Sequence, residues 1–130
     1  MNIRLVRSIL LTSLVVSLSA CMPQRQFYWG QYEDSLYARH QHAGAGGEAH
    51  ASGMLATTLA APPTSVSQKV GPGIHADYGY LLFKQGQPDE AIAQFQQEAA
   101  TYPESKLLMD SMISRIQERK KKDQEKPPTP

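Results

Sequence analysis

The chain has 130 residues, of which 13 are basic and 12 acidic, and it contains a single cysteine. This length limits it to one small domain. The balanced charge excludes the strongly basic surface of nucleic-acid-binding proteins, and a single cysteine excludes an internal disulfide.

Residues 1–20 have the organisation of a secretory signal. Arg4 and Arg7 precede an apolar run from Ile9 to Leu18, and small residues follow it. The run has ten residues, about half of what a membrane-spanning helix needs. We therefore expect residues 1–20 to be removed as a signal peptide. The 13 basic residues then fall to 11, and the net charge becomes about −1.

The stretch Leu18-Ser19-Ala20-Cys21 resembles the lipobox of bacterial lipoproteins. The resemblance implies that Cys21 is lipidated and becomes the N-terminus, with two or three acyl chains as a permanent anchor. In enterobacterial lipoproteins an Asp in the next position favours the inner membrane, so Met22 favours the outer membrane. The alternative is an ordinary signal peptide, which would leave an unpaired thiol in an oxidising compartment.

Residues 21–40 contain a dense aromatic segment after the cysteine. Trp29, Tyr32 and Leu36 have the spacing of one helix face, and Phe27 and Tyr28 precede them. Such a segment either packs on its own domain or is exposed for a partner. Both interpretations stay open at the level of sequence.

Residues 41–73 are rich in Gly, Ala and Ser, and we expect a flexible linker there. A short helix is possible over residues 54–61, ended by Pro62-Pro63.

Residues 74–117 carry the clearest helical pattern. A first amphipathic helix of about three turns begins at Ile74 and ends near Gly86, a residue suited to a left-handed C-terminal position. A second begins at Pro88 and ends before Pro103. A third follows Ser105 and ends near residue 117, and residues 118–130 are predicted to be a disordered charged tail.

The first two of these helices resemble a tetratricopeptide repeat. Gly79, Gly86, Ala91, Phe95 and Pro103 occupy consensus positions. Gly79 and Ala91 would allow close helix approach, with Phe95 filling the space beside them. Two consensus positions differ, because His75 replaces an apolar residue and Glu98 replaces a small one. A carboxylate at Glu98 argues against a long regular array, since a buried unpaired charge is too costly.

The chain also resembles a family of small Gram-negative lipoproteins of unknown function, over roughly residues 27–116. The resemblance rests on Tyr28-Trp29-Gly30-x-Tyr32 with Leu36-Tyr37 and on Pro72-Gly73-x-His75-Ala76-x-x-Gly79. It continues through Gly86, Glu98, Tyr102-Pro103-Glu104-Ser105 and Met109-Asp110. Members are often encoded beside lipoproteins similar to the curli secretion channel. The resemblance therefore implies a role in an outer-membrane assembly.

Three other features could carry chemistry. His40, His42 and His50 could bind a metal, although no established ligand motif supports this. Glu98 is either a structural hydrogen-bond acceptor or a catalytic acid, and no obvious second group supports catalysis. Lys120–Lys122 either solubilise the tail or contact anionic lipid or peptidoglycan.

These observations predict an all-α fold with a tetratricopeptide-like hairpin, a capping helix, a flexible linker and a flexible tail. The function expected is that of a non-catalytic adaptor or accessory subunit of an envelope complex, anchored in the outer membrane through Cys21. Trp29, Tyr32 and Tyr80 are the candidate partner contacts. We expect no enzymatic activity, cofactor or nucleic acid, and identify no small-molecule substrate. The alternatives are a periplasmic metal-binding lipoprotein that uses the loop histidines, and an envelope enzyme.

Overall fold

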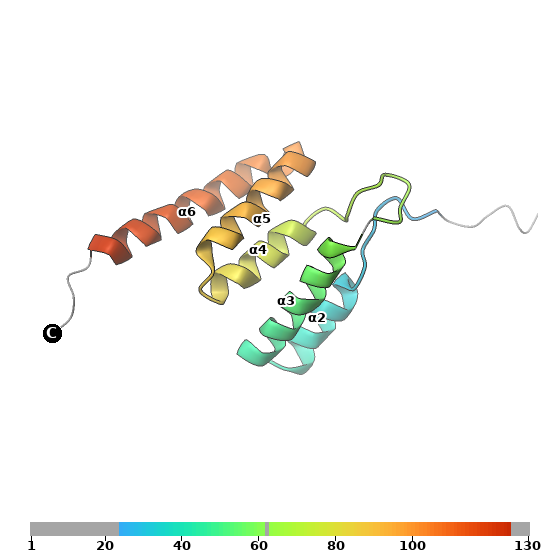
Figure 1. Cartoon of the computed structure of the whole chain (residues 1–130), viewed down its shortest axis with the longest axis horizontal. Helices are drawn as coiled ribbons and strands as arrows, with labels where there is room; N and C mark the ends of the chain where they lie inside the picture. The colour runs from blue at the N-terminus through green and yellow to red at the C-terminus, as the bar shows by residue number, and fades with distance from the viewer. Residues whose placement is uncertain (1–23, 62, 126–130) are drawn as a thin grey trace, which may run out of the picture.

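The computed structural model describes residues 24–61 and 63–125, and this part of the chain is all-helical. Its elements are α2 (Tyr32–Gln41), α3 (Ala45–Ala60), α4 (Ile74–Lys84), α5 (Pro88–Thr101), a 3₁₀ turn (Pro103–Ser105) and α6 (Lys106–Glu125). Helices α2 and α3 form one hairpin, α4 and α5 form a second, and α6 packs against α5 (Figure 1). The predicted all-α hairpin fold is confirmed. The signal peptide and Cys21 lie outside the described residues.

None of the helices in the described ranges is long and apolar enough to cross a membrane.

The second hairpin has the boundaries that its sequence predicts. Helix α4 occupies three turns, and Gly86 follows it with a φ of +80°, the left-handed conformation expected there. Pro88 occupies the first turn of α5, where its missing N–H removes no helical hydrogen bond. Helix α5 ends at Thr101, two residues before Pro103.

Close packing of α4 on α5 depends on Gly79. A Cβ at this position would lie 3.0 Å from the Phe95 ring and 3.1 Å from the Ala91 carbonyl oxygen. Phe95 and Ala91 are buried in one cluster with Leu82, Met109 and Ile116. The tetratricopeptide-like roles predicted for these positions are therefore confirmed.

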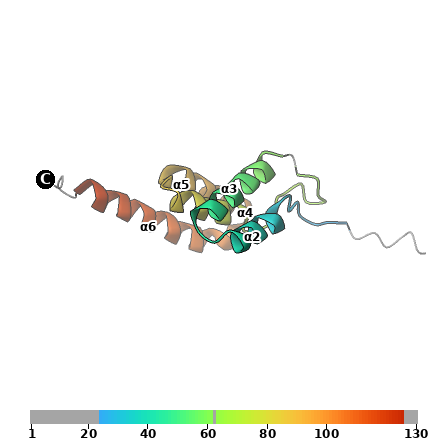
Figure 2. The same ribbon diagram turned by 90° about the horizontal axis from the view of Figure 1, so that it is seen from below.

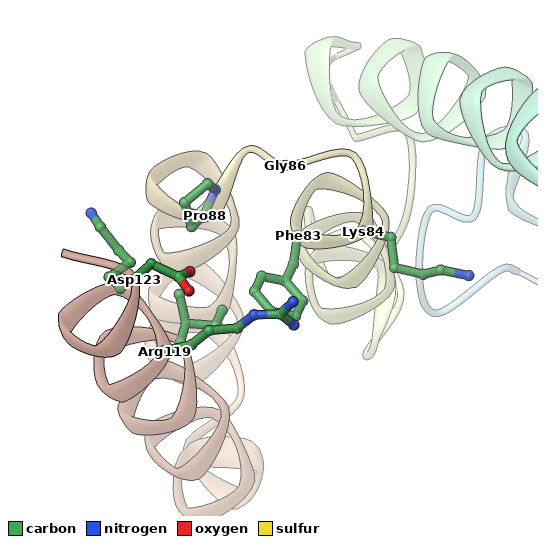
Figure 3. A pocket seen from close by; sticks show the side chains of 8 residues that line it. Phe83, Lys84, Gly86, Pro88, Arg119 and Asp123 are labelled. Carbon is green, nitrogen blue, oxygen red and sulfur yellow. The ribbon is translucent and has the colours of Figure 1, made fainter. Parts of the chain in front are cut away.

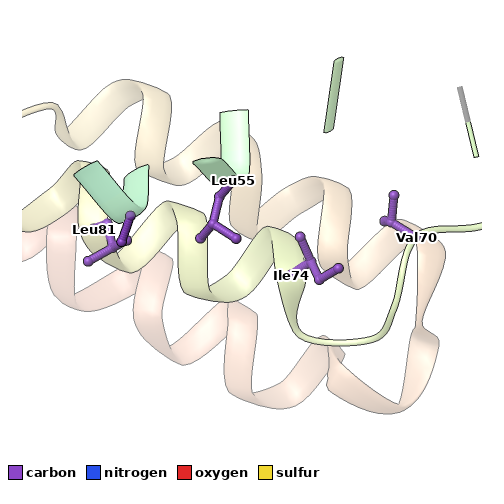
Figure 4. Packing of buried hydrophobic residues seen from close by; sticks show 5 residues of the cluster. Leu55, Val70, Ile74 and Leu81 are labelled. Atoms are coloured by element: carbon purple, nitrogen blue, oxygen red, sulfur yellow. The ribbon is translucent and has the colours of Figure 1, made fainter. Parts of the chain in front are cut away.

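The prediction of a flexible linker was wrong for residues 45–60. They form the 16-residue helix α3, of which the expected short helix is only the last part. Ala51 and Leu55 of α3 are fully buried against Ile74 and Leu81 of α4 (Figure 4). The protein therefore has two hairpins, and α3 covers the face of α4 that the second hairpin leaves open.

Helix α3 forms in spite of its composition. Each glycine in a helix interior costs about 1 kcal/mol relative to alanine, and short isolated helices are marginal in water. Tertiary contacts therefore stabilise α3. One glycine is required by packing, since a Cβ at Gly47 would lie 2.0 Å from the His42 carbonyl oxygen across the tight α2–α3 turn.

The predicted disordered tail was also wrong in part, because α6 continues to Glu125. Its polar end has local support. Lys120 pairs with Asp89 of α5 at 2.5 Å, and the Arg119 guanidinium lies 5.6 Å from the centre of the Phe83 ring. These contacts extend α6 beyond its last buried residue, Ile116.

The first part of the aromatic segment packs on its own domain. Tyr28, Trp29 and Tyr32 pack against the cluster formed by α3 and α4. The backbone of residues 25–28 is joined to residues 66–71 by four hydrogen bonds of 2.8–3.2 Å, and the Ser67 hydroxyl adds one to the Gln26 carbonyl. We call residues 25–28 and 65–71 the N-terminal clamp. Leu36 and Tyr37 remain exposed.

The role of α3 can be tested with Leu55→Ala. We expect a loss of about 2–5 kcal/mol in the free energy of unfolding, because the change removes buried methyl groups and leaves a cavity. Urea unfolding monitored by circular dichroism measures it. The control is Leu107→Ala, which truncates a side chain that is 85% exposed and should change the free energy by less than about 0.5 kcal/mol. Equal stability of the two variants would contradict the core position of Leu55.

Candidate partner-binding groove

An apolar groove of about 390 Å³ lies between α2, α4 and α6. Ten residues line it: Tyr32, Leu36, Gly73, Ala76, Asp77, Tyr80, Phe95, Leu108, Met109 and Met112. We call this surface the concave groove. Three large apolar residues in it are substantially exposed, namely Leu36 (44%), Tyr80 (45%) and Leu108 (61%). Such a concentration of exposed apolar side chains in a concavity is typical of binding sites for other proteins.

The concave groove follows from the order of the helices. Figure 2 shows α2 and α6 along one side of the molecule and α3 and α5 along the other. In helical repeat proteins the first helices of successive hairpins line a concave binding surface. Here α2 and α4 are these first helices and α6 takes the third position. The first hairpin, which the sequence analysis did not identify, is thus part of the groove.

An ion pair fixes α2 to α4 beside the groove. The Arg39 guanidinium donates to both carboxylate oxygens of Asp77, at 3.0 and 2.5 Å. Both side chains are largely shielded from solvent, so this bidentate pair orients the helices better than a fully exposed one. Burial raises the pKa of the nearby Tyr32 hydroxyl, and the negative charge of Asp77 adds to the effect.

The three predicted partner contacts do not lie together. Tyr32 and Tyr80 both line the concave groove, and the Lys84 ammonium lies 5.8 Å from the centre of the Tyr80 ring. Trp29 lies outside the groove, in two hollows beside Arg25 and Gly30, with its ring centre 5.6 Å from that of Tyr32. The three residues were grouped because Trp and Tyr are enriched at interfaces. The helical spacing that predicted one face for Trp29, Tyr32 and Leu36 does not include Trp29 in the structure, because α2 begins only at Tyr32.

Sequence reasoning did not assign the α6 residues to a binding surface. In the sequence, Leu108, Met109 and Met112 only continue the apolar period of the third predicted helix. Of these, Met109 is 3% exposed, whereas Leu108 is 61% exposed and its neighbour Leu107 is 85% exposed. The sequence feature that could have indicated this surface is the run of three adjacent apolar residues at 107–109, because one face of a helix cannot bury all three.

Glu98 has a structural hydrogen bond. Its side chain is 1% exposed, and Oε1 accepts from the backbone N–H of Gly73 at 2.7 Å. Gly73 directly precedes α4, so the carboxylate lies at the positive end of that helix dipole. Oε2 has no hydrogen-bond partner among the described residues. Glu98 thus connects α5 to the start of α4, as the structural interpretation of this residue required.

The histidines considered as metal ligands lie on the surface. His40 is in the last turn of α2, His42 follows α2, and His50 is exposed on α3. Within residues 24–61 and 63–125, no group of three or more His, Cys, Asp or Glu is arranged to hold a metal ion.

A second hollow lies beside the α4–α5 turn, where α6 passes it (Figure 3). Its lining is mainly polar, and its cations already have partners. Arg119 lies over the Phe83 ring, and Lys120 pairs with Asp89. Lys84 extends away from this hollow in Figure 3 and pairs with Glu48 of α3. The hollow therefore offers a weaker case for a partner than the concave groove does.

A family model described as "Domain of unknown function (DUF4810)" matches residues 26–112, more than half of the chain. The chain belongs to this family. The DUF4810 match includes every residue that lines the concave groove, and its limits lie close to those of the resemblance found in the sequence. Comparisons with curated proteins and with solved structures found no match.

Replacement of Glu98 tests its structural role in the DUF4810 domain. We expect Glu98→Ala to lower the free energy of unfolding by about 1–3 kcal/mol, because the Gly73 N–H loses its acceptor. Thermal and urea unfolding measure this loss. Gln97→Ala is the matched control, since Gln97 is exposed on the same helix. If both variants unfold like the parent, the bond between Glu98 and Gly73 does not stabilise the fold.

Alkaline pH should destabilise the protein through Tyr102. Its hydroxyl donates to the Val70 carbonyl, and burial, aided by Glu98 and Glu104, raises its pKa above 10.0. The contribution of the neutral Tyr102 hydroxyl to the free energy of unfolding is therefore complete below pH 10.0. This contribution is lost as the pH rises through the folded-state pKa. Tyr102→Phe should cost about 0.5–1.5 kcal/mol at neutral pH and show a smaller alkaline loss than the parent. Urea unfolding at several pH values measures the free energy of unfolding of both proteins. If it falls equally with rising pH in the parent and in Tyr102→Phe, Tyr102 is not the cause of the alkaline loss.

Proposed function

We propose that this protein is a non-catalytic lipoprotein of the outer membrane that acts as an adaptor or accessory subunit of an envelope secretion or assembly complex. The observation that carries the adaptor role is the concave groove, with its exposed Leu36, Tyr80 and Leu108. The membrane anchor rests on the lipobox-like stretch ending at Cys21, and the outer membrane on Met22. Both residues lie outside the described part of the structure.

The groove suits the apolar face of an amphipathic helix from another envelope lipoprotein. Its lining is mostly apolar and comes from α2, α4 and α6 together with Phe95 of α5, so the surface can receive side chains spaced by one helical turn. Met112, which is only partly buried, has a flexible side chain that can adapt to the side chains it contacts. The charged groups beside the groove, Arg39 and Asp77, already neutralise each other. An apolar partner face therefore fits better than a charged one.

The family resemblance supports the choice of partner class. Relatives encoded beside lipoproteins similar to the curli secretion channel would act with them, and such a partner would be held on the same membrane. Two proteins anchored on one membrane meet at a high effective concentration, so a groove of modest size can be sufficient.

Site-specific photo-crosslinking of the full-length protein in cells tests this proposal. A photoreactive residue replaces Tyr80 or Leu108 in the groove, and the control position is Leu107, which is exposed but does not line the groove. We expect the same crosslinked adduct from both groove positions, and little of this adduct from position 107. Mass spectrometry should identify an envelope lipoprotein, crosslinked through an amphipathic helix.

A companion measurement separates binding from folding. Tyr80→Asp should abolish co-purification of that partner without lowering the thermal midpoint, because Tyr80 is 45% exposed. An adduct of twice the protein's own mass would show a second copy in the groove instead. Equal adducts from Tyr80 and Leu107 would show that the groove is not the docking site.

A further inference from the structure

The first described residues are bound firmly to the body of the protein. Residues 25–28 of the N-terminal clamp are joined to residues 66–71 by five hydrogen bonds, four of them between backbone atoms. Tyr28 also forms an isolated parallel bridge with Val70, a buried residue of the core beside α4. The clamp therefore belongs to the folded body and is not a free tether.

Little chain separates the clamp from the proposed anchor. Cys21 precedes Arg25 by four residues, and an extended chain covers at most about 3.6 Å per residue. The clamp can therefore lie no more than roughly 14 Å from the lipidated cysteine. The polar headgroup layer of a bilayer is itself roughly 5–8 Å thick on each side. A body held this closely has its clamp end at the headgroups.

The exposed chemistry of the clamp end suits that position. Arg25 and Lys69 are exposed cations, and Val66 is 57% exposed. Trp29 lies half-buried in the same hollow as Arg25, with Glu33 as the one carboxylate that lines it. Cations attract anionic headgroups, and tryptophan is enriched at membrane–water interfaces because its ring is apolar and its N–H is polar.

We propose that the N-terminal clamp is a membrane-contact surface that holds the body end-on against the bilayer carrying the Cys21 lipids. This inference rests on the proposed lipidation of Cys21. Arg25 and Lys69 contact phospholipid headgroups, and Trp29 lies at the interface. The clamp and the C-terminal end of α6 lie at opposite ends of the molecule in both ribbon views, so α6 ends away from the membrane (Figures 1 and 2).

The orientation also restricts the partner. Tyr32 is the first residue of α2, Gly73 directly precedes α4, and Leu108 lies in the first turn of α6. The concave groove therefore begins near the clamp end of the body, close to the bilayer, and extends along α4 to Tyr80. A partner helix in the groove must lie in a membrane-proximal segment, as it would in a second lipoprotein shortly after its own anchor.

Fluorescence of Trp29 can test the membrane contact, because it is the only tryptophan in the chain. The lipidated full-length protein is reconstituted into vesicles of phosphatidylethanolamine and phosphatidylglycerol, with or without brominated acyl chains that quench tryptophan. We expect brominated lipids to quench Trp29 in the parent protein. Arg25→Glu/Lys69→Glu should lose most of this quenching, and high salt should weaken it in the parent.

The matched control is Lys121→Glu/Lys122→Glu, which makes the same charge change on exposed residues near the opposite end of the molecule. It should keep the quenching of the parent. Arg25→Glu alone serves as a second variant, since the clamp uses only the backbone carbonyl of Arg25. Circular dichroism confirms that each variant is folded.

Sedimentation with the vesicles separates the two proposals. If the protein does not sediment with vesicles, or if Cys21→Ser sediments equally well, the lipid anchor itself is wrong and the inference falls with it. If the protein sediments but brominated lipids do not quench Trp29, the membrane-contact surface is wrong while the anchor stands. Equal quenching in the two double variants would also overturn the contact surface.

Discussion

Helix α4 has to be covered on two faces, and the rest of the structure depends on how this is done. Ile74 and Leu81 belong to the cluster shared with α3, whereas Leu82 belongs to the cluster shared with α5 and α6. Tyr78 packs against both clusters. A single repeat-like hairpin could bury only one of these faces, and an exposed second face would leave the domain without enough buried apolar surface to be stable.

The first hairpin supplies this cover and forms the groove as a consequence. With α3 against α4, the other helix of the hairpin, α2, is joined to α4 by the ion pair of Arg39 and Asp77. Helix α6 caps the second hairpin from the other direction. Helices α2, α4 and α6 then surround a concave surface on which Leu36, Tyr80 and Leu108 stay exposed within the described residues. The need to cover α4 and the presence of a candidate binding surface therefore have the same structural origin.

The start of α4 is where the separate parts of the fold meet. Glu98 from α5 accepts a hydrogen bond from the Gly73 N–H, and the Tyr102 hydroxyl donates one to the Val70 carbonyl. Residues 25–28 of the N-terminal clamp are hydrogen-bonded to residues 66–71, just before the helix. Each contact connects residues at least 25 positions apart in sequence. This convergence holds the N-terminal segment to the body, and it is why a lipid on Cys21 would restrain the whole domain and not only its first residues.

The sequence by itself determined the second hairpin, because its boundaries depend on local chemistry. The left-handed Gly86, Pro88 in a first turn and Pro103 after a last turn act within a few residues of where they stand. The tertiary structure decided that residues 45–60 are helical, since their glycines weaken an isolated helix and α4 buries Ala51 and Leu55. The tertiary structure also decided which group Glu98 binds and which residues line the concave groove, since these residues lie between positions 32 and 112. Contacts of that separation in sequence have no signal in local periodicity, because they exist only once the chain has folded.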